Sequence, residues 1–268
     1  MDIDPSAEIH PSAVIEPGAQ IGAGCRIGPF CLIGPEVRLG SRVWIKSHAV
    51  ITGATVIGAE TVVFPFATIG EIPQDLKFQG EKSRLEIGAR NRIREHVTIN
   101  TGTEGGGYVT RVGDDCLLMA GSHVAHDCLI GNRVILVNNA AVAGHCVLED
   151  EVIVGGLSGV HQWVRIGHGA IIGALSMVTA DVIPHGLVQG PRGQLEGLNL
   201  VGLKRRGVAR SEISALRDVY MALSEGNFRD SARRLLDEPS EAAAQSAYVR
   251  EVLDFILGPS DRSFLTPR

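Results

Sequence analysis

Aliphatic residues recur at every sixth position through the first two thirds of this chain. Every sixth residue from 9 to 69 is Ile, Leu or Val, and the same holds from 87 to 99 and from 112 to 178. A period of six fits neither the 3.6-residue turn of an α-helix nor the plain alternation of a β-strand. It predicts a short strand followed by a corner, repeated many times to form a solenoid.

Three such units close a triangular coil of eighteen residues, and neighbouring coils stack at the strand spacing of ~4.8 Å. Each recurring aliphatic side chain then points inward, above its counterpart in the preceding coil. The repeat breaks over residues 70–86 and 100–111, where we expect two loops to leave the solenoid. Loops on a rigid scaffold often carry function.

Composition limits the kinds of protein this chain can be. Of its 268 residues, 44% are hydrophobic, which excludes wholesale disorder. The 25 Lys and Arg are outnumbered by 30 Asp and Glu, so no overall basic field favours nucleic acid or a membrane surface. We expect neither a signal peptide nor a membrane span, because MDIDPSAEIH lacks an apolar core and no apolar run approaches ~20 residues. The five cysteines include no CxxC pair, which favours buried thiols in a reducing cytoplasm.

The six-residue repeat fades after about residue 181, and a helical pattern follows it. Ser211 is a candidate N-cap, and Gly226 is the expected end of the helix that begins there. Further helices are expected over residues 228–238 and 240–258. We therefore predict a solenoid domain over residues 1–190 and an α-helical domain over 191–268 that covers the open end of the solenoid.

Four of the nine histidines fall on one ridge of the predicted solenoid. His123, His126, His145 and His161 fall within five consecutive positions of the coil, on three successive levels. A single histidine at a corner is usually a solvated side chain, but four titratable groups in one stripe indicate a working site. Two more histidines, at residues 168 and 185, fall on a different edge.

Two chemistries use such a row of imidazoles. One is a zinc ion held by three of them, with a fourth position open for water, as in a hexapeptide-repeat carbonic anhydrase. The other is general-base catalysis, in which one neutral imidazole removes a proton from a hydroxyl group while the others bind substrate. The histidines alone leave both possibilities open.

Longer motifs carry a family resemblance. HVAHDCLIGN, VNNAAVAGHC, GGLSGVHQW and NLVGLKRRG are similar to the UDP-N-acetylglucosamine O-acyltransferases of the hexapeptide-repeat class, as are IGPFCLIGP, IGEIPQDLKFQGE and IGARNRIREHVTIN. The resemblance covers nearly the whole chain and implies a left-handed parallel β-helix. It also implies transfer of an (R)-3-hydroxyacyl chain from acyl carrier protein to the 3-hydroxyl of UDP-N-acetylglucosamine, the first step of lipid A biosynthesis.

The resemblance further implies roles for particular residues. His126 matches the general base, Asp127 is placed to orient its ring, and the backbone N–H of Gly144 matches the oxyanion donor. Because adjacent strand residues face opposite ways, Asp127 can do this only at a corner. Asp75 and Lys77 match a loop that reaches the site across a subunit boundary. The other positions that match substrate-binding residues are His123, His145, His161, Gln162, Asn199, Arg205 and Arg206.

The chain departs from the family at two places. Val201 stands where a glutamate is common, which puts one substrate contact in question. Ala174 matches a small residue, often glycine, that sets acyl length, and Arg192 matches another residue at the end of that channel. The extra methyl group at residue 174 predicts a shorter acyl chain than the longest that the family accepts.

We predict a homotrimer with sites between subunits. A triangular prism has flat outer faces that can pack together, and the first loop needs a neighbouring subunit on which to act. We expect a cytoplasmic enzyme without metal or resident cofactor, because the acyl group arrives on the phosphopantetheine of acyl carrier protein.

Three alternatives have less support. A zinc enzyme of carbonic anhydrase type has no use for QDLKF and LKRRG. The related N-acyltransferase has an extra N-terminal domain, for which hexads that begin at Ile9 leave no room, and a purely structural solenoid does not explain the histidines.

Overall fold

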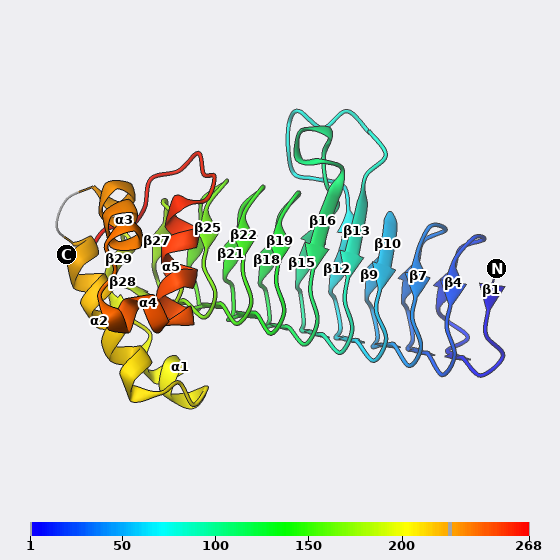
Figure 1. The fold of residues 1–268 in the computed structure, drawn as a ribbon. Coiled ribbons are helices and arrows are strands. Elements are labelled where there is room, and N and C mark those ends of the chain that lie inside the picture. The colour runs from blue at the N-terminus through cyan, green and yellow to red at the C-terminus, as the bar shows by residue number, and fades with distance from the viewer. Residues whose placement is uncertain (1, 225–226, 268) are drawn as a thin grey trace.

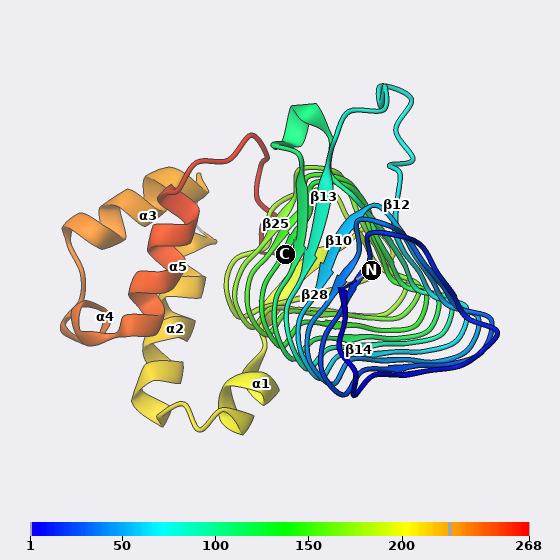
Figure 2. The ribbon, with the colours of Figure 1, turned by 90° about the vertical axis from the view of Figure 1, so that its right-hand side faces the viewer.

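Short parallel strands stack along one axis into three sheets, which form the faces of a triangular prism. The computed structural model describes residues 2–224 and 227–267 of this arrangement (Figure 1). Seen along the axis, the coils lie over one another, and the α-helices gather beside the C-terminal coils (Figure 2).

Each sheet takes one strand from almost every coil. Sheet A contains β1 (Asp2–Ile3), β4 (Gln20–Ile21), β7 (Arg38–Leu39), β10 (Ala54–Ile57), β13 (Arg84–Ile87), β16 (Val109–Val112), β19 (Leu129–Ile130), β22 (Val147–Leu148) and β25 (Arg165–Ile166). Sheet B contains β2 (Glu8–Ile9), β5 (Arg26–Ile27), β8 (Trp44–Ile45), β11 (Val62–Val63), β14 (Arg92–Ile93), β17 (Leu117–Leu118), β20 (Ile135–Leu136), β23 (Ile153–Val154), β26 (Ile171–Ile172), β28 (Gly186–Gln189) and β29 (Gln194–Leu198). Sheet C contains β3 (Val14–Ile15), β6 (Leu32–Ile33), β9 (Val50–Ile51), β12 (Thr68–Glu71), β15 (Thr98–Asn100), β18 (His123–Val124), β21 (Ala141–Val142), β24 (Gly159–Val160) and β27 (Met177–Val178).

The inward side chains of successive coils stack in register. In sheet C, Ile33 pairs with Ile51, Ile51 with Ile69, and Ile69 with Ile99. All four side chains are fully buried. Backbone hydrogen bonds join the same coils, for example from the Gly34 N–H to the Ile51 carbonyl oxygen at 2.8 Å. The aliphatic positions of the six-residue repeat are therefore the core of the prism, as predicted.

Both insertions leave the prism at the edge between sheets C and A. The first, residues 72–83, joins β12 to β13, and the second, residues 101–108, joins β15 to β16 and contains the 3₁₀-helix η1 (Glu104–Gly106). The Glu104 N–H donates to a Glu81 carboxylate oxygen at 3.2 Å, so the two loops touch (Figure 2). Both are shorter than the expected ranges because the flanking strands are longer than the usual two residues.

Helices follow the last coils of the prism. Within the described residues they are α1 (Leu200–Arg205), α2 (Arg210–Leu223), α3 (Phe228–Asp237), α4 (Glu241–Gln245) and α5 (Ala247–Leu257). The expected N-cap at Ser211 is wrong: Ala209 holds the cap position of α2 without a side-chain bond, because the buried face of the helix fixes where it begins. Gly226, the expected end of that helix, lies outside the described residues.

The third expected helix, residues 240–258, is two helices. Ser246 has extended backbone angles between α4 and α5, and its hydroxyl accepts a hydrogen bond from the Val249 N–H at 3.1 Å. A serine that caps the next helix therefore interrupts an otherwise continuous helical pattern.

A partly buried polar cluster fastens α5 to the edge between sheets A and B. Glu251 accepts hydrogen bonds from His168 at 2.7 Å and from His185 at 2.9 Å, and Arg206 donates to His185 Nδ1 at 3.1 Å. Burial opposes the charge on Glu251, but the two histidines lower its pKa to about 2. The histidines expected on a second edge therefore hold the helices against the prism.

All five cysteines are free and buried, as the sequence predicted. Among residues 2–224 and 227–267, no helix is long and apolar enough to cross a membrane. The division into domains at residues 190 and 191 stays a prediction.

Candidate active site

The four histidines of the predicted ridge lie along the edge between sheets C and A. His123 belongs to β18 of sheet C, and His126, His145 and His161 occupy the connections from β18 to β19, β21 to β22 and β24 to β25. Each of these connections runs from sheet C to sheet A, as do both inserted loops. The coil spacing of ~4.8 Å brings the imidazoles together with the loops.

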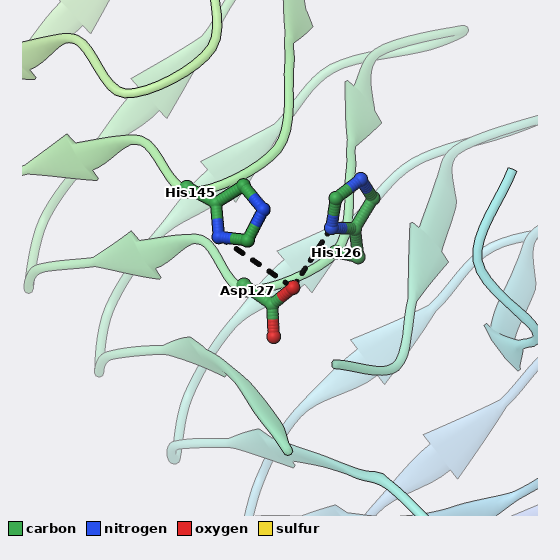
Figure 3. Close-up of side chains that lie close together, drawn as sticks. All are labelled: His126, Asp127 and His145. Carbon is green, nitrogen blue, oxygen red and sulfur yellow. Dashed lines mark hydrogen bonds and ion pairs between the residues drawn. The ribbon is translucent and has the colours of Figure 1, made fainter. Parts of the chain in front are cut away.

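Asp127 turns its side chain toward His126 because it sits at a corner. Its φ of 59° is left-handed, so the alternation of side chains along a strand does not apply here. The His126 Nδ1 and an Asp127 carboxylate oxygen are 2.8 Å apart (Figure 3). This is the corner geometry that the expected role of Asp127 requires.

The second inserted loop holds the Asp127 carboxylate. The Thr103 backbone N–H donates to one carboxylate oxygen at 2.7 Å, and the Thr103 hydroxyl donates to the other at 2.6 Å. A Cβ at Gly106 would stand 1.9 Å from the carboxylate carbon, so this loop packs too closely for any side chain there. The sequence analysis did not single out Thr103; the break in the repeat was the available signal.

These hydrogen bonds set the protonation of the Asp127–His126 pair. Burial opposes ionisation of Asp127, but hydrogen bonds from His126 and Thr103 lower the pKa of its carboxyl group. An ionised carboxylate only accepts hydrogen bonds, so His126 donates its Nδ1–H, and a neutral imidazole then keeps its lone pair on Nε2. That arrangement suits a general base.

Gly144 faces the free side of His126. A Cβ at Gly144 would lie 2.4 Å from His126 Cε1 and 2.6 Å from Nε2, so a side chain would displace the ring. Within the described residues, the Gly144 N–H has no hydrogen-bond partner. A proton acceptor and an unused backbone donor therefore lie close together.

Two further imidazoles border the pair. The His145 ring meets the His126 ring edge-on at 4.9 Å and stacks on Trp163 at 3.8 Å, and His123 Nδ1 lies 2.7 Å from the Thr98 hydroxyl. Burial lowers the pKa of His145, although Asp127 opposes this, and burial also lowers the pKa of His123. Both rings are therefore neutral at pH 7.

Two cavities flank this ridge. The larger, about 610 Å³, lies under the inserted loops and is lined by Asp75, Lys77, His145 and Trp163, among others. In a single chain, Asp75 and Lys77 of the first inserted loop thus line the same cavity as His145. This loop needs no second subunit to reach His145.

The smaller cavity, about 390 Å³, runs along the outer face of sheet C. Its polar lining residues include His123, His126, His161 and Gln162, and its floor includes Ala141, Gly159 and Met177.

The remaining predicted residues lie elsewhere in the single chain. Asn199 caps α1, accepting from the Gly202 N–H at 2.9 Å and donating to the Gly169 carbonyl oxygen at 2.9 Å. Arg206 belongs to the cluster at the A–B edge, and Arg205 is exposed in the last turn of α1. Ala174 is exposed between β26 and β27, and Arg192 is exposed between β28 and β29.

The side chains offer one metal-ligand set at the ridge. Donor atoms of His126, Asp127 and His145 all lie within 4.8 Å of one another. Among the described residues, His161 does not join them, so the three-imidazole set of the zinc hypothesis is not assembled. The hydrogen bonds of Asp127 to Thr103 and His126 occupy the carboxylate that a metal would need.

Comparison with known proteins identifies the family. A family model for the second domain of UDP-N-acetylglucosamine O-acyltransferases matches residues 181–265, and a bacterial transferase hexapeptide model matches residues 3–35 and 110–144. The acyl-[acyl-carrier-protein]–UDP-N-acetylglucosamine O-acyltransferase of Paracoccus denitrificans is 74% identical over 206 residues, 77% of this chain and 77% of the relative. This chain belongs to the UDP-N-acetylglucosamine O-acyltransferase family.

Solved structures of UDP-N-acetylglucosamine acyltransferases share the fold along the whole chain. The structure from Campylobacter jejuni has a TM-score of 0.90 at 40% identity and covers 97% of this chain and 100% of its own. The structure from Bacteroides fragilis has a TM-score of 0.86 at 36% identity and covers 98% and 99%. These matches confirm the left-handed parallel β-helix with C-terminal helices, and they do not support the zinc-enzyme alternative.

We predict that Thr103→Val lowers the turnover number for acyl transfer about tenfold, the typical effect of losing one hydrogen bond to a charged group. Val keeps the shape of the side chain but removes the hydroxyl bond to the Asp127 carboxylate, which then keeps only the backbone N–H of residue 103 as a donor from this loop. Steady-state kinetics should show Thr103→Ser close to wild type, because serine keeps the hydroxyl. Equal rates for the Val and Ser variants would contradict this role.

Proposed function

We propose that this chain transfers an (R)-3-hydroxyacyl group from acyl carrier protein to the 3-hydroxyl of UDP-N-acetylglucosamine, the first step of lipid A biosynthesis. One observation carries the proposal: the His126 ring, hydrogen-bonded through Nδ1 to a buried carboxylate, lies against Gly144, whose backbone N–H is unused. Acyl transfer needs both a base for the hydroxyl and a donor for the oxyanion. The names and close identity of the relatives support the same reaction.

The residues act in a defined order in this proposal. His126 Nε2 removes the proton from the sugar hydroxyl as its oxygen attacks the thioester carbonyl carbon. The Gly144 N–H donates to the oxyanion of the tetrahedral intermediate, a contribution of about 3–4 kcal/mol in comparable sites. The intermediate collapses, the carbon–sulfur bond breaks, and the thiolate takes the proton from His126. Asp127 stabilises the imidazolium between these steps.

The two cavities divide the binding work. We assign the sugar nucleotide to the larger cavity, where Asp75, Lys77 and His145 offer charged and hydrogen-bonding groups. His123, His161 and Gln162 border the second cavity, whose small apolar floor suits the acyl chain. The acyl group arrives on the phosphopantetheine of acyl carrier protein, so the proposal includes no resident cofactor.

His126→Ala should lower the turnover number by 10²–10⁴, the usual contribution of a general base. His126 is not part of the inward aliphatic stack, so the melting temperature should stay close to wild type. His10→Ala, at a corner between sheets B and C, is the matched control. Chelators should leave activity unchanged; activity that depends on added metal would contradict the general-base mechanism.

We also propose a homotrimer whose sites lie between subunits. Asn199, Arg205 and Arg206 lie on or beside the A–B edge of the prism, whereas His126 lies on the C–A edge. Residues on two edges of one prism can share a site only if neighbouring prisms bring those edges together. Arg205 is exposed and suits a phosphate group of the sugar nucleotide. Val201 is 60% exposed beside it, where it offers no polar contact.

Mixing two inactive variants tests this assembly. His126→Ala and Arg205→Ala, co-expressed with different tags and purified through both, should recover part of the wild-type activity, because some sites then combine an intact His126 with an intact Arg205. Sites confined to one chain would show no recovery. Sedimentation that finds an active monomer at assay concentration would also contradict the proposal.

Three residues are candidates for the end wall that limits acyl length. Ala174 and Arg192 are the positions implied by the family resemblance. The structure adds Met177, whose thioether lies over Gly159 in the smaller cavity: a Cβ built on Gly159 would meet Met177 Cε at 3.1 Å. Met177 occupies the next rung of sheet C after Gly159, which is two rungs beyond Ala141 and three beyond His123.

We expect Met177→Ala to lengthen the preferred acyl chain by roughly two to four carbons, because the smaller side chain opens about one further rung of ~4.8 Å. Ala174→Gly should also lengthen the preferred chain, by less. The measurement is kcat/KM over a series of acyl carrier protein thioesters of increasing length. An unchanged optimum in either variant removes that residue from the end wall and leaves Arg192 to be tested.

The cytoplasm is the proposed location. Five buried cysteines without a disulfide suit a reducing compartment, and cell fractionation that recovers the protein elsewhere would contradict this.

A further inference from the structure

The C-terminal tail returns from α5 to the prism. After Leu257 the chain runs back to the last coils (Figure 2). There the Phe264 ring stacks with Phe228 at 5.6 Å and meets Phe255 edge-on at 6.3 Å. Asp181 and Phe264 form an isolated parallel bridge. The tail is therefore packed against the folded chain.

Asp181 anchors this tail on both sides of residue 262. Its fully buried carboxylate accepts from the Ser260 hydroxyl at 2.6 Å and from Arg165 Nε at 2.8 Å. Its backbone N–H donates to the Ser263 carbonyl oxygen at 2.8 Å, and its carbonyl oxygen accepts from the Leu265 N–H at 2.9 Å. Three hydrogen bonds between Asp181 and the tail fix the segment that carries Arg262, and Arg165 holds the Asp181 carboxylate in place.

Arg262 reaches the candidate active site from this anchored segment. Its Nη2 lies 3.0 Å from His161 Nδ1, and His161 lines the same cavity as His126. A guanidinium group only donates hydrogen bonds, so His161 Nδ1 must accept. His161 is then neutral and carries its proton on Nε2.

Without Arg262, His161 Nδ1 has another hydrogen-bond partner. Its Nδ1 also lies 3.3 Å from the Gln162 carbonyl oxygen, a contact that requires the proton on Nδ1. The two contacts demand opposite tautomers. Arg262 therefore selects the form in which Nε2 is a hydrogen-bond donor.

Arg262 also brings a permanent positive charge beside His161, which lines the smaller cavity. Within residues 2–224 and 227–267 it makes no ion pair with a carboxylate, unlike Arg165, which pairs with Asp181. Most of its N–H groups remain available for a ligand. Both substrates of the proposed reaction carry phosphate: the diphosphate of the sugar nucleotide and the phosphodiester of phosphopantetheine. Guanidinium groups suit either one.

We infer that Arg262 is a positioning residue of this site, which holds His161 as an Nε2–H donor and binds a substrate phosphate. The phosphate part rests on the proposed function, whereas the tautomer part does not. Neither the repeat pattern nor any motif in the sequence pointed to this residue.

The test compares Arg262→Gln and Arg262→Lys with wild type. Arg250→Gln is the matched control, because Arg250 lies exposed on α5 and pairs with Asp254. Nitrogen-15 NMR of labelled histidine, with His161→Gln for assignment, reports the His161 tautomer without any need for activity. Steady-state kinetics give KM separately for UDP-N-acetylglucosamine and for the acyl carrier protein thioester.

We expect Arg262→Gln to shift His161 toward the Nδ1–H form and to raise one KM about tenfold or more, with a smaller effect in Arg262→Lys and none in Arg250→Gln. A raised KM for the sugar nucleotide identifies its diphosphate as the group that Arg262 binds. A raised KM for the thioester identifies the phosphodiester of phosphopantetheine instead. An unchanged tautomer overturns the positioning role, and two unchanged KM values overturn the phosphate role. A wild-type protein that transfers no acyl group would refute the proposed function and leave the tautomer result standing.

Discussion

The stacking of inward aliphatic side chains in register between coils is the interaction on which the rest of this structure depends. Ile51 lies against Ile33 on one side and Ile69 on the other, and each is fully buried. Burial of such a side chain stabilises the fold by about 1.5–3 kcal/mol. Because the core is repeated at every level, residues with the same position in the coil must lie above one another along one edge. That constraint, rather than any local motif, gathers the histidines.

The same constraint decides where the chain can be interrupted. An insertion is tolerated at a corner, because the strands on either side keep their register, as Ile69 and Ile99 do around the first loop. Both loops leave the prism at the C–A edge, where each brings a side chain to the candidate active site. One carries Lys77 to the cavity beside His145, and the other brings Thr103 to the Asp127 carboxylate. The rigid prism positions His126, and the loops complete its surroundings.

Much of the site followed from spacing, and parts did not. The ridge of histidines was predictable because a fixed coil length converts sequence position into spatial position. The hydrogen bond from His126 to Asp127 was not, since it needs the left-handed φ of residue 127. The resemblance placed Asn199 and Arg206 in the site, yet in one chain they cap a helix and join the His185 cluster. In the proposed homotrimer, these residues contribute to a site only across a subunit boundary.

The sequence by itself determined the three-sided prism, its aliphatic core, the two loops and the edge that carries the histidines, because a strict period needs only local information. The tertiary structure decided which distant segments meet. Glu251 joins His168 and His185 to α5, Ser246 divides the last helical segment, and Arg262 reaches His161 from the far end of the chain. None of these contacts has a period, and each depends on how the non-repeating C-terminal segment packs against the prism. Spacing along the chain therefore could not reveal them.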